Sequence, residues 1–227
     1  MSLGTLLIYF ALLMIIPIWA QSRVKSTYQK YSKIATSSYM TGAEVARKVL
    51  DENGLYDVQI EETKGTLTDH YDPRKKVVRL SSEIFHGRSM AASAVAAHEV
   101  GHAIQDAEEY AFLKFRTALV PVANFGSNTA IFIILAGFIF SAMNLVLLGI
   151  LFMAAAVLFQ LVTLPVEFNA SNRAMTQLVT TGIIQNNEER ETKKVLDAAA
   201  LTYVAAALIA VAELIRFVLM FVAVNNE

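Results

Sequence analysis

Residues 89–105 read SMAASAVAAHEVGHAIQ, a run of good helix formers that contains the pattern HExxH at positions 98–102. Residues four apart lie one above the other on a helix, so His98 and His102 can present imidazole nitrogens to one metal ion. Glu99 lies beside them, where a carboxylate can take a proton from water instead of binding the metal. The alternative is two surface histidines one turn apart. The helical context and the small neighbouring residues, in a chain with only four His, favour the zinc site of a hydrolase.

The composition is not that of an average soluble domain. Of the 227 residues, 55% are hydrophobic and only 17% are charged, and the mean hydropathy is +0.46. The net charge of −1 gives no reason to expect a nucleic-acid partner. The chain contains no Cys, so any metal site must use His and carboxylate ligands, and disulfides are excluded.

Four apolar blocks are long enough to cross a bilayer, which takes about 20 apolar residues. We therefore predict a mainly α membrane fold, with four transmembrane helices and a small α+β, zincin-like part. The first block has the alternative of a signal peptide, but it lacks a basic n-region, which favours a retained anchor. The predicted parts are a first transmembrane helix (1–21), a polar segment with a small sheet and the HExxH helix (22–117), a transmembrane hairpin (118–166), a polar segment with a glutamate-bearing helix (167–198), and a fourth transmembrane helix with a short tail (199–227).

Charge predicts the orientation of these spans. Four crossings put both termini on one side of the membrane and both polar segments on the other. Of the 19 Lys and Arg residues, all but Arg216 lie in the segments 21–117 and 168–198. The positive-inside rule then predicts a multi-pass protein of the cell membrane, with the polar segments and the site in the cytoplasm and both termini outside.

The first polar segment carries local signals for a small α+β part. The patterns predict a helix over 22–53, a short strand at 56–60, two strands within 65–80 joined by a turn at Asp72-Pro73, and the HExxH helix over 88–108. By analogy with zincin folds, we expect the strand at 75–80 to pair with the extended backbone of a substrate.

The metal site needs a third ligand, because a catalytic zinc commonly keeps three protein ligands and one open position. Glu167 is the best candidate. It stands where the third apolar block ends, and a carboxylate there is expensive to place unless something binds it. The alternative is an ordinary interfacial carboxylate. A helix that continues past Glu167 would carry Ser171 on the same face one turn later.

Three motifs together resemble the YugP-like neutral zinc metallopeptidases of bacterial membranes: HEVGHAIQ at 98–105, DHYDP at 69–73 and PVEFNASNRA at 165–174. The resemblance covers nearly the whole chain, including the order of the spans. It implies a gluzincin site that holds one Zn²⁺ per chain, with His98, His102 and Glu167 as ligands and Glu99 as general base.

The chain departs from that family pattern near the third ligand. The family usually has Asp where this chain has Asn169. More distant membrane gluzincins, the CAAX-prenyl and heat-shock proteases, carry Asp at the position matched by Ser171. Carboxylates at such positions orient a ligating His and fix its tautomer. Asn169 and Ser171 can do this more weakly, or Asp69 can substitute for them.

The remaining polar candidates each have a structural alternative. His70 and Tyr71 can donate hydrogen bonds to an oxyanion, or they can stabilise a turn beside Pro73. Arg173 can stabilise the tetrahedral intermediate or bind a substrate carboxylate, or it can form a salt bridge. Glu213 and Arg216 lie one turn apart within the fourth span, which indicates an ion pair inside the membrane.

The sequence thus predicts a membrane-embedded zinc metalloendopeptidase, a hydrolase in which water activated by Glu99 at the zinc cleaves peptide bonds at the cytoplasmic membrane surface. Its partners would be the lipid bilayer and a peptide or protein substrate. One rival is a non-proteolytic membrane zinc protein, such as a scaffold or sensor, although a structural site has no need of Glu99. The other is a zinc hydrolase of a non-peptide amide or lipid.

Overall fold

The computed structural model describes residues 3–225, and the chain divides into two compact units. The helical unit consists of the chain up to Pro17, Ala111–Pro165 and the chain from Tyr203. The site unit consists of Ile18–Tyr110 and Val166–Thr202. Each unit is described by itself below.

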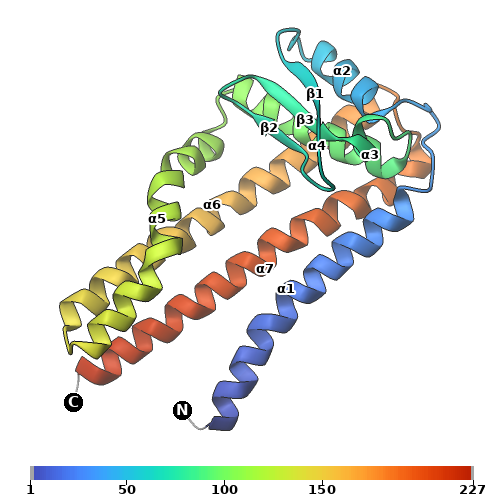
Figure 1. The fold of residues 1–227 in the computed structure, drawn as a ribbon. Coiled ribbons are helices and arrows are strands. Elements are labelled where there is room, and N and C mark those ends of the chain that lie inside the picture. The colour runs from blue at the N-terminus through green and yellow to red at the C-terminus, as the bar shows by residue number, and fades with distance from the viewer. Residues whose placement is uncertain (1–2, 226–227) are drawn as a thin grey trace. The chain divides into compact units, whose positions relative to one another are not determined.

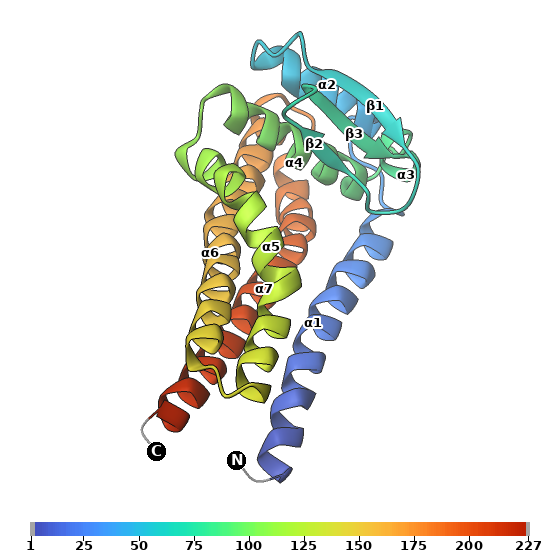
Figure 2. The same ribbon diagram turned by 60° about the vertical axis from the view of Figure 1, so that its left-hand side comes forward.

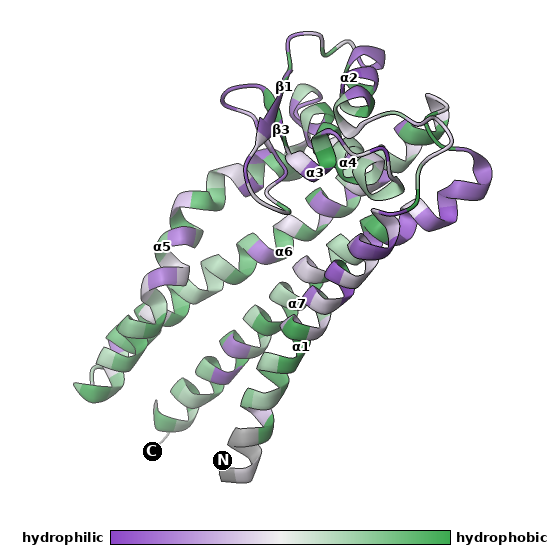
Figure 3. Ribbon diagram, turned by 45° about the vertical axis from the view of Figure 1, so that its right-hand side comes forward, coloured by the Kyte–Doolittle hydropathy of each residue, from purple (hydrophilic) through white to green (hydrophobic). Residues whose placement is uncertain are grey.

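Within residues 3–225, four helices are long and apolar enough to cross a membrane, as the four apolar blocks predict. They are α1 (Leu3–Tyr31), α5 (Ala111–Ile139), α6 (Met143–Thr180) and α7 (Asn186–Asn225). Figure 3 shows hydrophobic colouring along most of each of these helices and hydrophilic colouring at the beginning of α7. Helices α6 and α7 extend well beyond their apolar blocks, so α6 carries the polar residues that follow Pro165 without a break.

Within the helical unit, α5 and α6 form the predicted hairpin and run side by side (Figures 1 and 2). The chain turns at Ser141, whose φ is +52°. Gly126 allows close contact of the two helices, because a Cβ added there would lie 2.4 Å from the carbonyl oxygen of Phe152. Near the turn, Ile134 and Val146 are buried together with Phe217 of α7. The hairpin is therefore held by close packing of helix against helix.

The predicted helix over 22–53 is wrong, because the chain leaves the helical conformation in its middle. Helix α1 ends at Tyr31, and α2 (Gly42–Glu52) begins only after a non-helical connection. Thr41 and Glu44 exchange hydrogen bonds as a capping box, which fixes the start of α2. Gly42 is needed at this start, since an added Cβ would lie 2.2 Å from the carbonyl oxygen of Ile84.

The site unit contains a three-stranded sheet in the order β1-β3-β2 (Figure 1). Strand β3 (Val77–Ser81) pairs in parallel with β1 (Gln59–Thr63) and antiparallel with β2 (His70–Asp72). The expectation that the strand at 75–80 pairs with a substrate is therefore wrong. Both edges of β3 are already occupied, so only β1 and β2 have an edge without a strand partner among the described residues.

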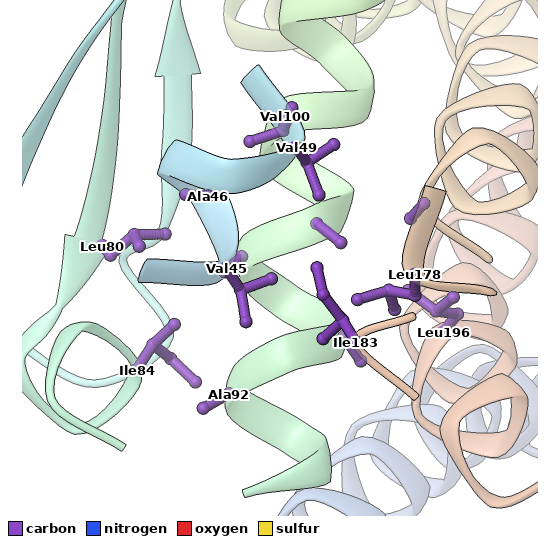
Figure 4. Packing of buried hydrophobic residues seen from close by; sticks show 14 of the residues in the cluster. Val45, Ala46, Val49, Leu80, Ile84, Ala92, Val100, Leu178, Ile183 and Leu196 are labelled. Carbon is purple, nitrogen blue, oxygen red and sulfur yellow. The ribbon is translucent and has the colours of Figure 1, made fainter. Parts of the chain in front are cut away.

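The core of the site unit surrounds α4 (Met90–Ala107), the helix that carries HExxH. Ser89 caps its first turn by accepting a hydrogen bond from the backbone N–H of Ala92. The short helix α3 (Ser82–Phe85) connects β3 to this region. Figure 4 shows α4 between two groups of buried apolar side chains, one from α2, β3 and α3 and the other from the C-terminal part of α6, the following loop and α7. Residues labelled on the two sides are Val45, Val49, Leu80 and Ile84, and Leu178, Ile183 and Leu196. Packing on both sides fixes the position of the motif.

Candidate metal centre

Three predicted ligand residues come together in the site unit: His98 and His102 of α4 and Glu167 of α6. One ligand atom of each lies within 4.8 Å of the others, and among the described residues this is the group of His and acidic side chains that could hold a metal ion. The Nε2 atoms of His98 and His102 lie 3.3 Å and 3.6 Å from Oε2 of Glu167. Glu167 is only 2% exposed. An ordinary interfacial carboxylate would face water, whereas the Glu167 carboxylate is buried beside two imidazoles.

The spacing of these atoms fits a zinc ion. Ligand atoms bound about 2.1 Å from a tetrahedral zinc lie about 3.4 Å from each other. The observed separations of 3.3 Å and 3.6 Å match that edge length and exceed the 2.7–2.9 Å typical of a charge-assisted hydrogen bond. Two neutral imidazoles and one carboxylate are also a donor set that zinc commonly accepts.

The two helices that carry the candidate ligands approach closely because position 101 is glycine. A Cβ added to Gly101 would lie 2.6 Å from the carbonyl oxygen of Ala170 and 3.2 Å from its Cα. Ala170 lies on α6 one turn after Glu167, and it is fully buried. The absence of a side chain at Gly101 therefore sets the distance between the histidines and the glutamate.

The second nitrogen of each histidine has its own oxygen partner. Nδ1 of His98 lies 3.2 Å from Oγ of Ser171, and Nδ1 of His102 lies 3.0 Å from Oε1 of Gln105. An amide oxygen can only accept, so the His102–Gln105 contact selects the tautomer with the proton on Nδ1. That tautomer leaves the Nε2 lone pair of His102 directed to the side of Glu167, as a metal ligand requires.

Gln105 is a site residue that the sequence analysis did not assign. Its amide nitrogen donates to the backbone oxygen of Val166, at 2.8 Å, and to Oδ1 of Asn169, at 2.9 Å. The side chain is completely buried and connects the HExxH helix to the turn of α6 that carries Glu167. A signal for it was present, because a residue three positions after His102 lies on the same face of the helix.

Asn169 and Arg173 belong to the same hydrogen-bond network. Oδ1 of Asn169 accepts from Gln105 and also from Nε of Arg173, at 2.7 Å. Arg173 in turn forms an ion pair with Glu108, with Nη2 2.6 Å from the carboxylate oxygen. Arg173 thus forms a salt bridge, which was the alternative to a role in binding the tetrahedral intermediate or a substrate carboxylate. Asn169 is connected to His102 through the Gln105 side chain, which contacts both residues.

Glu99 is buried next to the ligand pair, with 8% of its surface exposed. Burial raises the pKa of its carboxyl group, while the charges of His98 and His102 act in the opposite direction. A raised pKa suits a group that accepts a proton and later returns it near neutral pH. For His102, burial opposes protonation, yet the hydrogen bond and charge of Glu167 prevail and raise its pKa. The negative charge of Glu167 therefore favours a positive charge, a proton or a metal ion, at His102.

The DHYDP residues lie beside this cluster without joining it. Asp69 accepts hydrogen bonds from the backbone N–H and the hydroxyl of Ser81, at 2.7 Å and 3.0 Å, so it does not orient either histidine. Burial raises the pKa of Asp69 in spite of these bonds. His70 is exposed, and its Nδ1 lies 2.8 Å from the carbonyl oxygen of Thr68.

Tyr71 connects the sheet to the HExxH helix. Its hydroxyl donates to Asp106 across 2.9 Å, one helical turn after His102. Burial and this hydrogen bond raise the pKa of Tyr71, so the hydroxyl remains a donor at neutral pH. The contact fixes β2 against α4.

In the helical unit, the predicted ion pair between Glu213 and Arg216 is present, with Nη2 2.5 Å from the carboxylate oxygen. The hydroxyl of Tyr9 also donates to Glu213. The guanidinium group of Arg216 lies 4.2 Å from the centre of the Phe217 ring. These contacts give both charges a partner inside an apolar helix.

Comparison with known proteins gives the family of this chain. A family model described as "Putative neutral zinc metallopeptidase" matches residues 6–222. The chain is also 56% identical over 209 residues to the Bacillus subtilis (strain 168) protein named "Putative membrane protease YugP", covering 92% of this chain and 93% of the relative. No solved structure matches this chain. Because the family model covers nearly the whole sequence, the chain belongs to this family of neutral zinc metallopeptidases.

Proposed function

We propose that this protein is a membrane-embedded zinc metalloendopeptidase that cleaves peptide bonds at the cytoplasmic surface of the membrane. The observation that carries the proposal is the cluster of His98, His102 and Glu167 with the buried Glu99 beside it. Membership of the metallopeptidase family and the protease name of the Bacillus subtilis relative support the same conclusion.

The residues of the cluster divide into ligands and a base. His98 and His102, through Nε2, and Glu167, through a carboxylate oxygen, would hold one zinc ion. When bound, zinc supplies a Lewis acid that lowers the pKa of water and polarises a carbonyl group. Glu99 accepts the proton of the attacking water and returns it to the leaving amine. Gln105 and Ser171 hold the two imidazole rings in place while the charges change.

The edge of the sheet next to the site suggests how a peptide would bind. Strand β2 is an edge strand, and Tyr71 fixes it to α4 through Asp106. An extended peptide can add to such an edge through main-chain hydrogen bonds, which carry little sequence selectivity. We therefore assign substrate pairing to β2 in place of the central strand β3.

The cytoplasmic location of the site rests on charge. The segments that contain the ligands and the base also contain nearly all Lys and Arg residues, and such segments stay on the cytoplasmic side. With four spans, both termini would then lie outside.

The decisive experiment is Glu99→Gln in the full-length, detergent-purified protein. We expect zinc content to remain at the wild-type level and proteolysis of casein or of a membrane protein to be lost, because the base is removed while all three ligands stay. Glu52→Gln, which removes an exposed carboxylate at the end of α2, is the matched control and should keep both properties. A chelator should abolish wild-type cleavage.

The same assay separates the rival functions. A zinc-loaded wild-type protein that cleaves no peptide in any of these substrates would contradict the proposal and favour the scaffold or sensor. Hydrolysis of a lipid or a simple amide that depends on Glu99, without proteolysis, would favour the other hydrolase. Loss of zinc with retained activity in Glu99→Gln would show that the assigned roles are wrong.

A further inference from the structure

We propose that a pocket between α1 and α7 in the site unit binds the phosphate group of an anionic phospholipid. The pocket has a volume of about 490 Å³ and lies apart from the metal cluster in sequence and in lining residues. From α1 it is lined by Arg23, Ser26, Thr27 and Lys30, which are spaced as one face of a helix. From α7 it is lined by a second such face, which includes Lys194, Asp197 and Leu201.

The charge of the pocket matches an anion. Its lining contains three cations and one acid. That acid, Asp197, already has both carboxylate oxygens within 2.8 Å of Nζ of Lys193. Among residues 3–225, neither Arg23 nor Lys30 forms a salt bridge. The Lys30 ammonium lies 4.9 Å from the centre of the Tyr31 ring, and it is also attracted by Glu191, the carboxylate that pairs with Lys194. Two cations without a salt bridge thus line the pocket, with Ser26 and Thr27 between them. The Ser26 hydroxyl donates to the carbonyl oxygen of Arg23 at 3.1 Å, so the Thr27 hydroxyl is the one that can join the cations in binding phosphate oxygens.

The two ends of the pocket differ, and this difference favours a lipid over free phosphate. The hydroxyl of Tyr31 donates to Glu191, which places the end of α1 beside the start of α7. Lys30 and Lys194 therefore lie at the polar end of the pocket. Arg23 and Leu201 lie at the other end, where the apolar block of α1 ends and that of α7 begins. Figure 3 shows the same change from hydrophilic to hydrophobic along α1 and α7.

The change from a polar to an apolar lining matches a phospholipid, which is polar at its head group and apolar at its acyl chains. A phospholipid whose phosphate contacts the cations can place the beginning of an acyl chain against Leu201. Free phosphate makes no use of the apolar end. These features favour a site for one anionic phospholipid at the surface of the bilayer.

The test measures lipid binding to the full-length protein in neutral detergent by native mass spectrometry. The probes are phosphatidylglycerol, phosphatidylcholine and inorganic phosphate. We expect retained phosphatidylglycerol and little phosphatidylcholine, with inorganic phosphate unable to displace the lipid at equal concentration. The double variant Arg23→Gln/Lys30→Gln should bind phosphatidylglycerol about 30-fold more weakly, the effect expected for two basic residues at a membrane surface.

A matched control removes the same charge outside the pocket. Lys25→Gln/Lys33→Gln takes two nearby cations that do not line it and should leave lipid binding unchanged. Ser26→Leu keeps every charge but places a larger side chain at an exposed position that lines the pocket. It should therefore also weaken lipid binding. Zinc content checks that each variant is folded.

Three results would overturn the proposal. Equal losses in the two double variants would mean general attraction to anionic lipid. Equal binding of phosphatidylcholine would mean that net negative charge is not recognised. Displacement by inorganic phosphate at equal concentration would mean a site for free phosphate.

Discussion

Adding one methyl group at Gly101 should separate the two helices that form the metal centre. In Gly101→Ala the new Cβ would lie 2.6 Å from the carbonyl oxygen of Ala170. Ordinary contact begins near 3.4 Å, so α4 and α6 must move apart by about 0.8 Å. The obstacle is backbone, which cannot rotate away as a side chain can. The movement must therefore be taken up by the helices that carry the ligands.

The consequence for zinc follows from this distance. Glu167 lies one turn before Ala170, so its carboxylate moves away from His98 and His102 together with the helix. Zinc–ligand distances tolerate only about 0.2 Å, and a misplacement near 1 Å can reduce activity about 100-fold. We expect zinc affinity to fall 10- to 100-fold, which is about 1.4–2.8 kcal/mol. Overpacking costs about 1–3 kcal/mol of stability, and the better helix propensity of Ala returns up to about 1 kcal/mol.

The assay is zinc competition against a chromogenic chelator, with thermal unfolding measured on the same samples. Gly126→Ala is the matched control, since its Cβ would lie 2.4 Å from the carbonyl oxygen of Phe152, in a contact within the helical unit. We expect it to lose similar stability and to bind zinc within about twofold of wild type. Wild-type zinc affinity in Gly101→Ala would refute the argument, and equal zinc loss in both variants would assign the effect to general destabilisation.

Three further predictions concern the ligands and the orientation. Gln105→Leu removes the acceptor of an imidazole N–H from a buried site, so zinc affinity in the same competition should fall about 10- to 100-fold; unchanged affinity would mean that this amide does not position the ring. Glu167→Gln should lose most zinc and all cleavage in elemental analysis and activity assays, whereas Glu167→Asp should keep partial binding; full occupancy of the Gln variant would move the third-ligand role to another residue. Cys placed at Asn144 should react with an impermeant reagent on intact cells, whereas Cys at Lys64 or Lys194 should not, and the reverse pattern would invert the orientation.

The sequence was sufficient for features that depend on local periodicity. The spacing of His98 and His102 on one helical face follows from 3.6 residues per turn, and four spans follow from the length of apolar blocks. The turn at Asp72-Pro73 between two antiparallel strands was also confirmed. Glu167 was predicted as the third ligand from its place at the end of the third apolar block, and the family resemblance implied the same role.

Only the tertiary structure decided which distant groups meet. Strand β3 lies in the centre of the sheet. The pattern of residues within a strand does not indicate this position, because strands that are distant in the sequence can pair with each other. Gln105 contacts the turn that carries Glu167 because α6 brings Asn169 and the backbone of Val166 within its reach. Arg173 has the acid Glu108 as a partner 65 positions away. Local sequence predicted the candidate ligands, His98 and His102 through helix geometry and Glu167 through its place at the end of an apolar block. The packing of α4 against α6 at Gly101 decided their separation, because contact distances depend on atoms of both helices at once.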